Sequence, residues 1–205
     1  MRTRAVVFDL WDTLAFWSVE RTRDLFDQLA MRLGSPDWNE TYVERMTMPL
    51  EPYFRSLGAD EALATELAAE RAALTREVLT PREGALETLD ELRRRGLRLA
   101  LISVCSEDVC RVWGETAFAQ RFDAAVFSAT CALMKPDPRI YLLACEQLGV
   151  EPPACLYVGD GANDELAGAR SVGMNAVLIQ RSGEHPHPEW DGLRITSIPD
   201  VLDLV

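Results

Sequence analysis

The sequence predicts an α/β protein whose core is a three-layer, mostly parallel sheet, with a small all-helical domain inserted into it. Three observations lead to this prediction. From residue 81 onward, short apolar runs alternate with amphipathic segments of helical length, which is typical of parallel βαβ units. An earlier apolar run, Val6–Phe8, stops at Asp9 and is typical of a buried parallel strand. Between these regions, residues 16–80 contain no convincing strand.

The inserted segment is expected to be helical. Apolar residues recur at helical spacing from Arg21 to Leu33. A second helix is expected to start after residues 37–40 and to be interrupted near Pro49 and Pro52. The segment Glu61–Leu79 is rich in Ala, Leu and Glu, which have high helix propensity. These helices predict a separate subdomain over residues 16–80.

The rest of the chain is expected to complete the sheet. Two of its predicted helices are followed by Gly96 and Gly149, which suit the left-handed position after a helix. The tail beyond Arg181 is expected to be a loop that leads into a last helix. The expected elements are helix Gly84–Arg95, strand Leu97–Ile102, helix Asp108–Trp113, strand Ala124–Phe127, helix Pro138–Leu148, strand Cys155–Val158, helix Asp164–Val172, strand Ala176–Ile179 and helix Ile198–Leu204.

Composition excludes several functional classes. The chain has 205 residues and a formal net charge of −12, and it lacks a basic stripe that would bind a nucleic-acid backbone. No apolar run is long enough to span a bilayer, and Met1–Arg4 precede a strand, not the apolar core of a signal peptide. The five cysteines contain no C-x-x-C pair. We therefore expect a cytoplasmic protein with reduced cysteines, no nucleic-acid partner and no membrane contact, of open oligomeric state.

Polar residues follow the ends of the predicted strands. In a parallel sheet, Asp9, Ser103 and Asp160 lie at the same edge, where ligands bind in open α/β folds. Lys135 lies between these strands in a loop whose two prolines fix the backbone ahead of a helix, so the loop can bring an ammonium group to that edge. Asp164 follows Asp160 by four residues across a glycine-containing turn, which can aim both carboxylates at one cation.

Four segments that contain these residues resemble the motifs of the haloacid dehalogenase superfamily of hydrolases. In chain order they are Phe8–Leu14, Leu99–Ser103, Lys135–Pro138 and Val158–Glu165. One such segment is a weak signal, whereas four in the right order, with a helical insertion after the first, are a strong one. The resemblance implies a Rossmann-like core domain of residues 1–15 and 81–205, and a helical cap of residues 16–80. The position of the insertion implies the cap type found between the first and second motifs.

The resemblance also implies how the site works. Asp9 matches the nucleophile, which attacks phosphorus and forms an aspartyl-phosphate that water then hydrolyses. Ser103 matches a phosphate-binding hydroxyl, and Lys135 matches a cation that pairs with the nucleophile and with the phosphate. The implied activity is phosphatase activity on a small phosphorylated metabolite.

A metal ion is implied as well. Mg²⁺ would be held by Asp9, Asp160 and Asp164, together with the backbone carbonyl of Trp11. The family spacing selects Asp164 and not Glu165 as the outer ligand. Carboxylates about 4 Å apart repel one another by roughly 4 kcal/mol per pair at an effective dielectric constant of 20. A nucleophile in such a cluster therefore needs a cation beside it.

Trp11 departs from the pattern of most phosphatases in the family, which carry an aspartate at this position as general acid and base. Indole does not transfer a proton usefully at neutral pH, and Asp12 should point elsewhere. Haloacid dehalogenases carry an aromatic residue here, use no metal and release a halide that needs no proton. Because the acidic pair of the last motif is kept, a phosphatase is favoured. A metal-independent 2-haloacid dehalogenase and a phosphate-binding protein without turnover remain as alternatives.

Further residues are weaker candidates. Trp11 and Trp17 have two interpretations. Either they line a substrate pocket or, as is favoured, they only pack under the cap. In the cap, Arg45, Tyr53 and Arg55 are candidates for contact with the substrate. The favoured interpretation is that all three are exposed to solvent. His185 and His187 lie between prolines and are interpreted as part of a surface loop, not as metal ligands.

Overall fold

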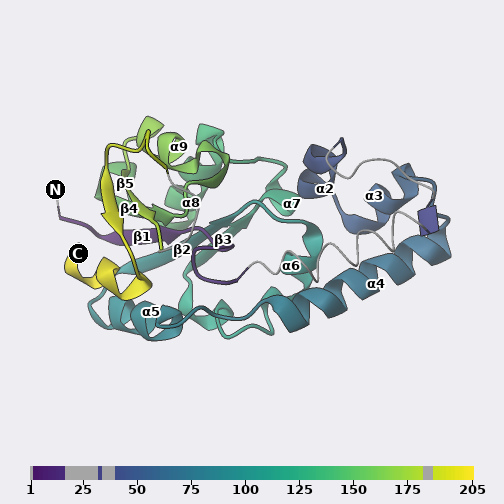
Figure 1. Cartoon of the computed structure of the whole chain (residues 1–205), viewed down its shortest axis with the longest axis horizontal. Coiled ribbons are helices and arrows are strands. Elements are labelled where there is room, and N and C mark those ends of the chain that lie inside the picture. The colour runs from purple at the N-terminus through teal and green to yellow at the C-terminus, as the bar shows by residue number, and fades with distance from the viewer. Residues whose placement is uncertain (1, 17–31, 34–39, 182–186) are drawn as a thin grey trace.

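The computed structural model describes residues 2–16, 32–33, 40–181 and 187–205. Its six-stranded sheet has the order β3-β2-β1-β4-β5-β6, and every neighbouring pair is parallel, so the predicted fold class is confirmed (Figure 1). The strands are β1 (Ala5–Phe8), β2 (Arg98–Ser103), β3 (Ala124–Phe127), β4 (Cys155–Gly159), β5 (Asn175–Ile179) and β6 (Leu193–Ile195). The α-helices are α2 (Tyr42–Thr47), α3 (Leu50–Ser56), α4 (Glu61–Val78), α5 (Ala85–Arg94), α6 (Glu107–Trp113), α7 (Ser128–Cys131), α8 (Pro138–Leu148) and α9 (Glu165–Ser171). Short 3₁₀ helices are η1 (Ala119–Arg121), η2 (Pro152–Ala154), η3 (Ala162–Asp164) and η4 (Ile198–Asp203).

Helices cover both faces of the sheet, which gives the core three layers. On one face lie α5 and α6, and on the other lie α8 and α9. Successive residues of β1 point to opposite faces, so that Val6 and Phe8 join one hydrophobic cluster and Ala5 and Val7 join the other. Burial on both sides explains why this strand is apolar throughout.

Between β1 and β2, the described residues form helices and no strand. We call α2, α3 and α4 the inserted helices; they lie at one end of the molecule (Figure 1). Two of them, α3 and α4, form a hydrophobic cluster of their own together with Ala59 from their connection; its members are Leu50, Tyr53, Phe54, Ala59, Ala64, Leu67 and Ala68. The chain leaves and re-enters the core side by side, because Ala15 and Pro81 form an antiparallel bridge. This bridge coincides with the predicted boundary between core and cap, and the division into two domains stays a prediction.

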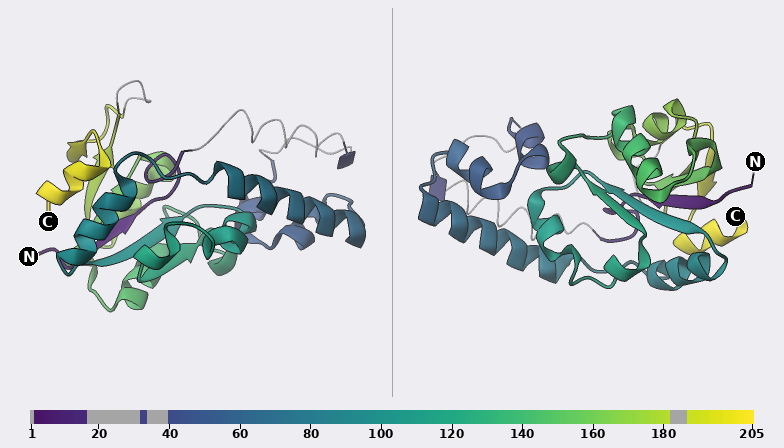
Figure 2. Two further views of the ribbon diagram at one scale, coloured as in Figure 1. Left: turned by 90° about the horizontal axis from the view of Figure 1, so that it is seen from below. Right: turned by 180° about the vertical axis from the view of Figure 1, so that it is seen from behind.

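The long helix α4 leads from the other two inserted helices back to the core and packs against α6 (Figure 2). Arg71 of α4 lies 3.1 Å from the carboxylate of Asp108 in α6, and both side chains are almost completely buried. Asp108 also accepts hydrogen bonds from Ser106 and Thr75. A buried charge without its partner is strongly unfavourable, so this network holds α4 in one position against the core.

Several elements differ from the sequence-based expectations. The strand β6 and the helix α7 are additional, and the last helix is η4, a 3₁₀ helix. The reason β6 escapes detection is that it has three residues, of which only Ile195 is buried. As expected, the helices break at Pro49, since α2 ends at Thr47 and α3 begins at Leu50. The interruption expected near Pro52 is wrong, because Pro52 lies in the first turn of α3, where a proline is tolerated. The helix expected at Arg21–Leu33 lies outside the described residues except for its end. No helix in the described ranges is long and apolar enough to cross a membrane.

Candidate active site

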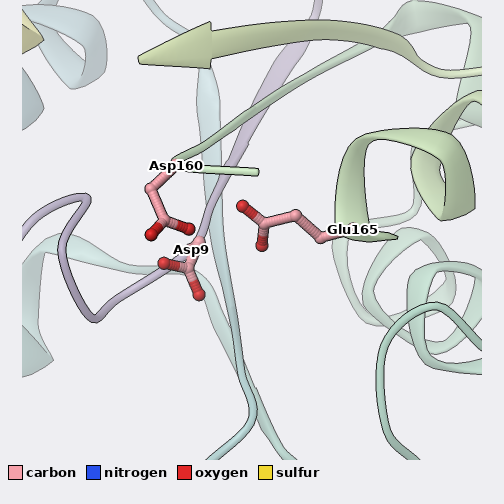
Figure 3. Close-up of side chains that lie close together, drawn as sticks. All are labelled: Asp9, Asp160 and Glu165. Carbon is pink, nitrogen blue, oxygen red and sulfur yellow. The ribbon is translucent and has the colours of Figure 1, made fainter. Parts of the chain in front are cut away.

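Two carboxylates reach the same edge of the sheet from adjacent strands. Phe8, the last residue of β1, pairs with Val158 of β4, and the Asp9 backbone N–H donates to the Val158 carbonyl at 2.9 Å. Asp9 and Asp160 therefore follow the ends of two neighbouring strands. A third carboxylate, from Glu165 at the start of α9, joins them. Each of the three offers an oxygen within 4.8 Å of the other two, and Figure 3 shows the groups turned toward one another.

Lys135 lies inside this group of carboxylates. Its ammonium nitrogen is 2.5 Å from Asp9 Oδ1 and 2.5 Å from Glu165 Oε2, and it also donates to the Tyr157 hydroxyl at 3.2 Å. The Tyr157 hydroxyl in turn donates to Glu165 Oε2 at 2.7 Å. Asp9, Lys135 and Glu165 are all buried. The proline-flanked loop thus delivers the lysine to the strand edge, as the sequence predicts.

Burial and mutual repulsion dominate the electrostatics of the cluster. Burial raises the pKa of Asp9 to about 8; Lys135 opposes this shift, and the carboxylates of Glu165 and Asp160 add to it. Burial, followed by the charge of Glu165, raises the pKa of Asp160 to about 7. Burial alone would lower the pKa of Lys135, but Asp9 and Glu165 outweigh it and raise that pKa. One ammonium group is therefore not enough to keep both Asp9 and Asp160 fully ionised near neutral pH.

Glu165, and not Asp164, completes the cluster. Asp164 has a left-handed backbone (φ 51°) ahead of α9, and its side chain is exposed. Glu165 is fully buried, and its Oε1 accepts from the Gly161 backbone N–H at 2.9 Å. A Cβ atom on Gly159 would lie 2.0 Å from Glu165 Oε1, so the glycine makes room for this carboxylate. The geometry does not support the expected choice of Asp164 over Glu165, and a metal-binding role for Asp164 stays a prediction.

The residues present fit a divalent metal ion. Carboxylate oxygens are the ligands that Mg²⁺ prefers, and three are gathered from Asp9, Asp160 and Glu165. With all three ionised, Lys135 neutralises one negative charge, and a divalent cation matches the two that remain. Such a cation would also reverse the upward pKa shifts of Asp9 and Asp160. The expected contribution of the Trp11 carbonyl stays a prediction.

Ser103 ends β2, next to the strand that carries Asp9. The side chain is completely buried, and its hydroxyl has no hydrogen-bond partner among the described residues. A buried hydroxyl without a partner is unfavourable, so a ligand oxygen at this position would satisfy it. This observation fits the predicted role of Ser103 in binding phosphate.

Trp11 and Asp12 lie where the chain turns away from Asp9. As expected from its place in the sequence, Asp12 points away from the cluster, and its carboxylate accepts a hydrogen bond from Arg82 at 2.8 Å. Trp11 packs against the core, and it also lines a cavity of about 270 Å³ between the core and the inserted helices. Trp11 therefore does both of the things that were expected as alternatives: it packs against the core and it lines a pocket. Trp17 lies outside the described residues.

The weaker candidates separate clearly. Arg45 is buried and lines the same cavity as Trp11, which differs from the expected solvent exposure. Tyr53 is also buried, in the cluster of the inserted helices, which again differs from the expected exposure. Arg55 is exposed, as expected, and pairs with Glu61. His187 forms a contact with Glu189 and is not part of the described carboxylate cluster, whereas His185 lies outside the described residues.

Glu165→Gln is expected to weaken Mg²⁺ binding by about 10-fold or more, because it removes a charged ligand. Asp164→Asn serves as the matched control and should leave the affinity nearly unchanged, since that side chain is exposed outside the cluster. Titration calorimetry with Mg²⁺ measures both, and thermal melts confirm that each variant is folded. Weaker binding in Asp164→Asn but not in Glu165→Gln would restore Asp164 as the ligand.

Comparisons with known proteins agree with this geometry. Residues 3–173 match the model of the haloacid dehalogenase-like hydrolase family. The chain is 32% identical over 124 residues to (S)-2-haloacid dehalogenase 4A from Burkholderia cepacia, a match that covers 59% of this chain and 53% of the relative. It is 30% identical over 133 residues to glyceraldehyde 3-phosphate phosphatase from Methanothermobacter thermautotrophicus, covering 62% of this chain and 58% of that protein.

The fold is shared with solved structures along the whole chain. The crystal structure of a HAD phosphatase from Thermococcus onnurineus superposes with a TM-score of 0.73 and 24% sequence identity, covering 98% of this chain and 97% of that one. The chain spans about half the length of the curated relatives it matches. These relatives include both dehalogenases and phosphatases, so the likeness alone does not choose between the two activities. The matched segment contains Asp9, Ser103, Lys135 and Asp160, and the chain therefore belongs to the haloacid dehalogenase-like hydrolases.

Proposed function

We propose that this hydrolase is a cytoplasmic, Mg²⁺-dependent phosphatase of small phosphorylated metabolites, with Asp9 as its nucleophile. The observation that carries the proposal is the cluster of three carboxylates, of which Asp9 and Glu165 are buried, beside a single ammonium group. Such a cluster needs a further cation, and Mg²⁺ suits a phosphate substrate better than a haloacid. The relative that is a glyceraldehyde 3-phosphate phosphatase supports the same choice. Five cysteines with free thiols are consistent with the proposed location.

In the proposed reaction, an oxygen of Asp9 forms a bond to phosphorus while the bond from phosphorus to the leaving group breaks. Water then cleaves the aspartyl-phosphate, which releases phosphate and regenerates the Asp9 carboxylate. Lys135 holds Asp9 Oδ1 in place and offsets the negative charge that gathers at the site. The Ser103 hydroxyl donates to an oxygen of the phosphate. Bound Mg²⁺ supplies additional positive charge to the phosphate oxygens.

The absence of a carboxyl group at position 11 predicts a strong dependence on the leaving group. A general acid contributes roughly 10²–10⁴-fold in rate when the leaving group needs a proton. Acyl phosphates release a carboxylate that needs none, so we expect them to exceed alkyl phosphates in kcat/KM by a factor in that range. Phosphate release in the presence of Mg²⁺ measures the ratio, and excess chelator is expected to abolish the activity.

Two results would contradict the proposed phosphatase function. If no phosphate ester or acyl phosphate is turned over, the proposed function is wrong. If Mg²⁺ and vanadate nevertheless bind in calorimetry, the chain is a phosphate-binding protein without turnover.

A second candidate function is favoured by a specific observation at Trp11. An aromatic side chain at this position and the similarity to a (S)-2-haloacid dehalogenase both fit dehalogenation. In that reaction Asp9 would attack carbon and displace a halide. Halide release from 2-chloropropionate that persists in excess chelator would establish this activity, and its absence would remove it.

A further inference from the structure

We propose that the cavity between the strand ends and the inserted helices holds an aromatic ring, and that the substrate is therefore a phosphorylated compound with a single-ring aryl group. This inference rests on the proposed phosphatase function and adds the class of its substrate. The cavity measures about 270 Å³, close to the lower end of the sizes that hold small ligands, so it suits one compact group.

The cavity is lined in part by close sequence neighbours of the candidate active-site residues. Its inner wall includes Trp11, Val104 and Asn163, which come from the same three loops as Asp9, Ser103 and Asp160. Its outer wall belongs to α2 and α4 of the inserted helices. A phosphate held at the strand ends would therefore direct the rest of its molecule into this space.

Most of the lining is apolar. Trp11, Tyr42, Met46, Val104 and Val109 contribute hydrophobic surface. Of the polar groups in the wall, Asp108 uses both carboxylate oxygens within the protein, one for Ser106 and the other for Arg71 and Thr75. Arg71, Ser106 and Asp108 bond to one another, and the rest of the polar lining is Arg45 and Asn163. Several sugar hydroxyl groups buried against this mostly apolar wall would not all find partners, which disfavours a polyhydroxylated substrate.

The remaining wall favours an aromatic ring over an aliphatic chain. Arg45 is buried, and its guanidinium carbon lies 5.6 Å from the centre of the Tyr42 ring. Indole, phenol and guanidinium groups all present flat faces on which an aromatic ring stacks, and arginine adds a cation–π attraction. Trp11, Tyr42 and Arg45 bring one of each to the same cavity.

The test compares benzoyl phosphate with acetyl phosphate, whose leaving groups have similar acidity, so that the ring is the main difference. We expect the wild-type protein to favour benzoyl phosphate in kcat/KM by about 10-fold or more. Equal values for the two compounds overturn the aryl inference and leave the phosphatase function intact. No phosphate release from either compound overturns the phosphatase function and this inference with it.

Two variants of α2 locate the effect. Met46→Trp fills the cavity and is expected to reduce the ratio of the two kcat/KM values by about 10-fold. Val43 lies on the same helix and is 58% exposed, so Val43→Trp adds the same bulk outside the cavity and should leave the ratio unchanged. An unchanged ratio in a folded Met46→Trp protein, verified by a thermal melt, overturns the inference. If Met46→Trp does not fold, the ratio of kcat/KM for benzoyl phosphate to that for acetyl phosphate in the wild-type protein still tests the inference.

Discussion

Asp9→Asn is expected to reduce kcat for acyl phosphates by about 10⁴-fold or more, the scale seen when a hydrolase loses its nucleophile. The amide of asparagine cannot form the aspartyl-phosphate. Because Asn has nearly the shape of Asp, the side chain can still accept from Lys135, which lies 2.5 Å from Asp9 Oδ1. The loss should therefore appear in kcat while the protein remains folded.

Asp12→Asn is the matched control for this variant. Asp12 is three residues away and pairs with Arg82 outside the carboxylate cluster, so this change should retain most of the activity. Mass spectrometry of acid-quenched reactions should detect phosphate on the wild-type chain and none on Asp9→Asn. If Asp9→Asn keeps substantial activity, Asp9 is not the nucleophile.

The parallel sheet, and the polar residues at the ends of its strands, could be predicted because both depend on local sequence patterns. Buried parallel strands are apolar throughout, and a polar residue such as Asp9 or Asp160 marks the point where each strand ends. The order of strands places these ends together whatever the details of the helices. By contrast, β6 has only Ile195 buried and carries little pattern, so its pairing with β5 depends on tertiary contacts.

The choice between Asp164 and Glu165 depends on where α9 begins, and helix boundaries are poorly defined by sequence. Some signal is nevertheless present. Glu165 precedes Gly168 and Ala169 by three and four residues, and all three are buried on one face of the helix. The backbone of Gly168 lies so close to Tyr141 that a Cβ atom would be 2.6 Å from its hydroxyl. This packing turns Glu165 inward.

Lys135 carries a sequence signal of a different kind. It is the only lysine in a chain with 20 arginines. A compact ammonium group on a flexible stem can contact Asp9, Glu165 and Tyr157 at once in a completely buried space, whereas a planar guanidinium group is wider and has fixed donor directions. The single lysine therefore marks the position where the chain needs a point charge.

The second large effect is a gain of function at Trp11. Trp11→Asp restores a carboxyl group at the position where a proton donor would stand, so kcat/KM for alkyl phosphates should rise by roughly 10²–10⁴-fold. Acyl phosphates should gain little, because their carboxylate leaving group departs without a proton. The wild-type preference for good leaving groups should then largely disappear. Phosphate release from a matched pair of alkyl and acyl phosphates measures the change.

Trp11→Asn separates proton transfer from the effect of added space. Both variants remove the indole from the cavity wall, and both should therefore weaken the preference for benzoyl over acetyl phosphate. Only the aspartate can donate a proton, so only Trp11→Asp should accelerate alkyl phosphates. Equal acceleration by both variants would show that the indole limits access to the site. Acceleration by neither would mean that proton transfer to the leaving group does not limit the rate, and the role assigned to position 11 would be wrong.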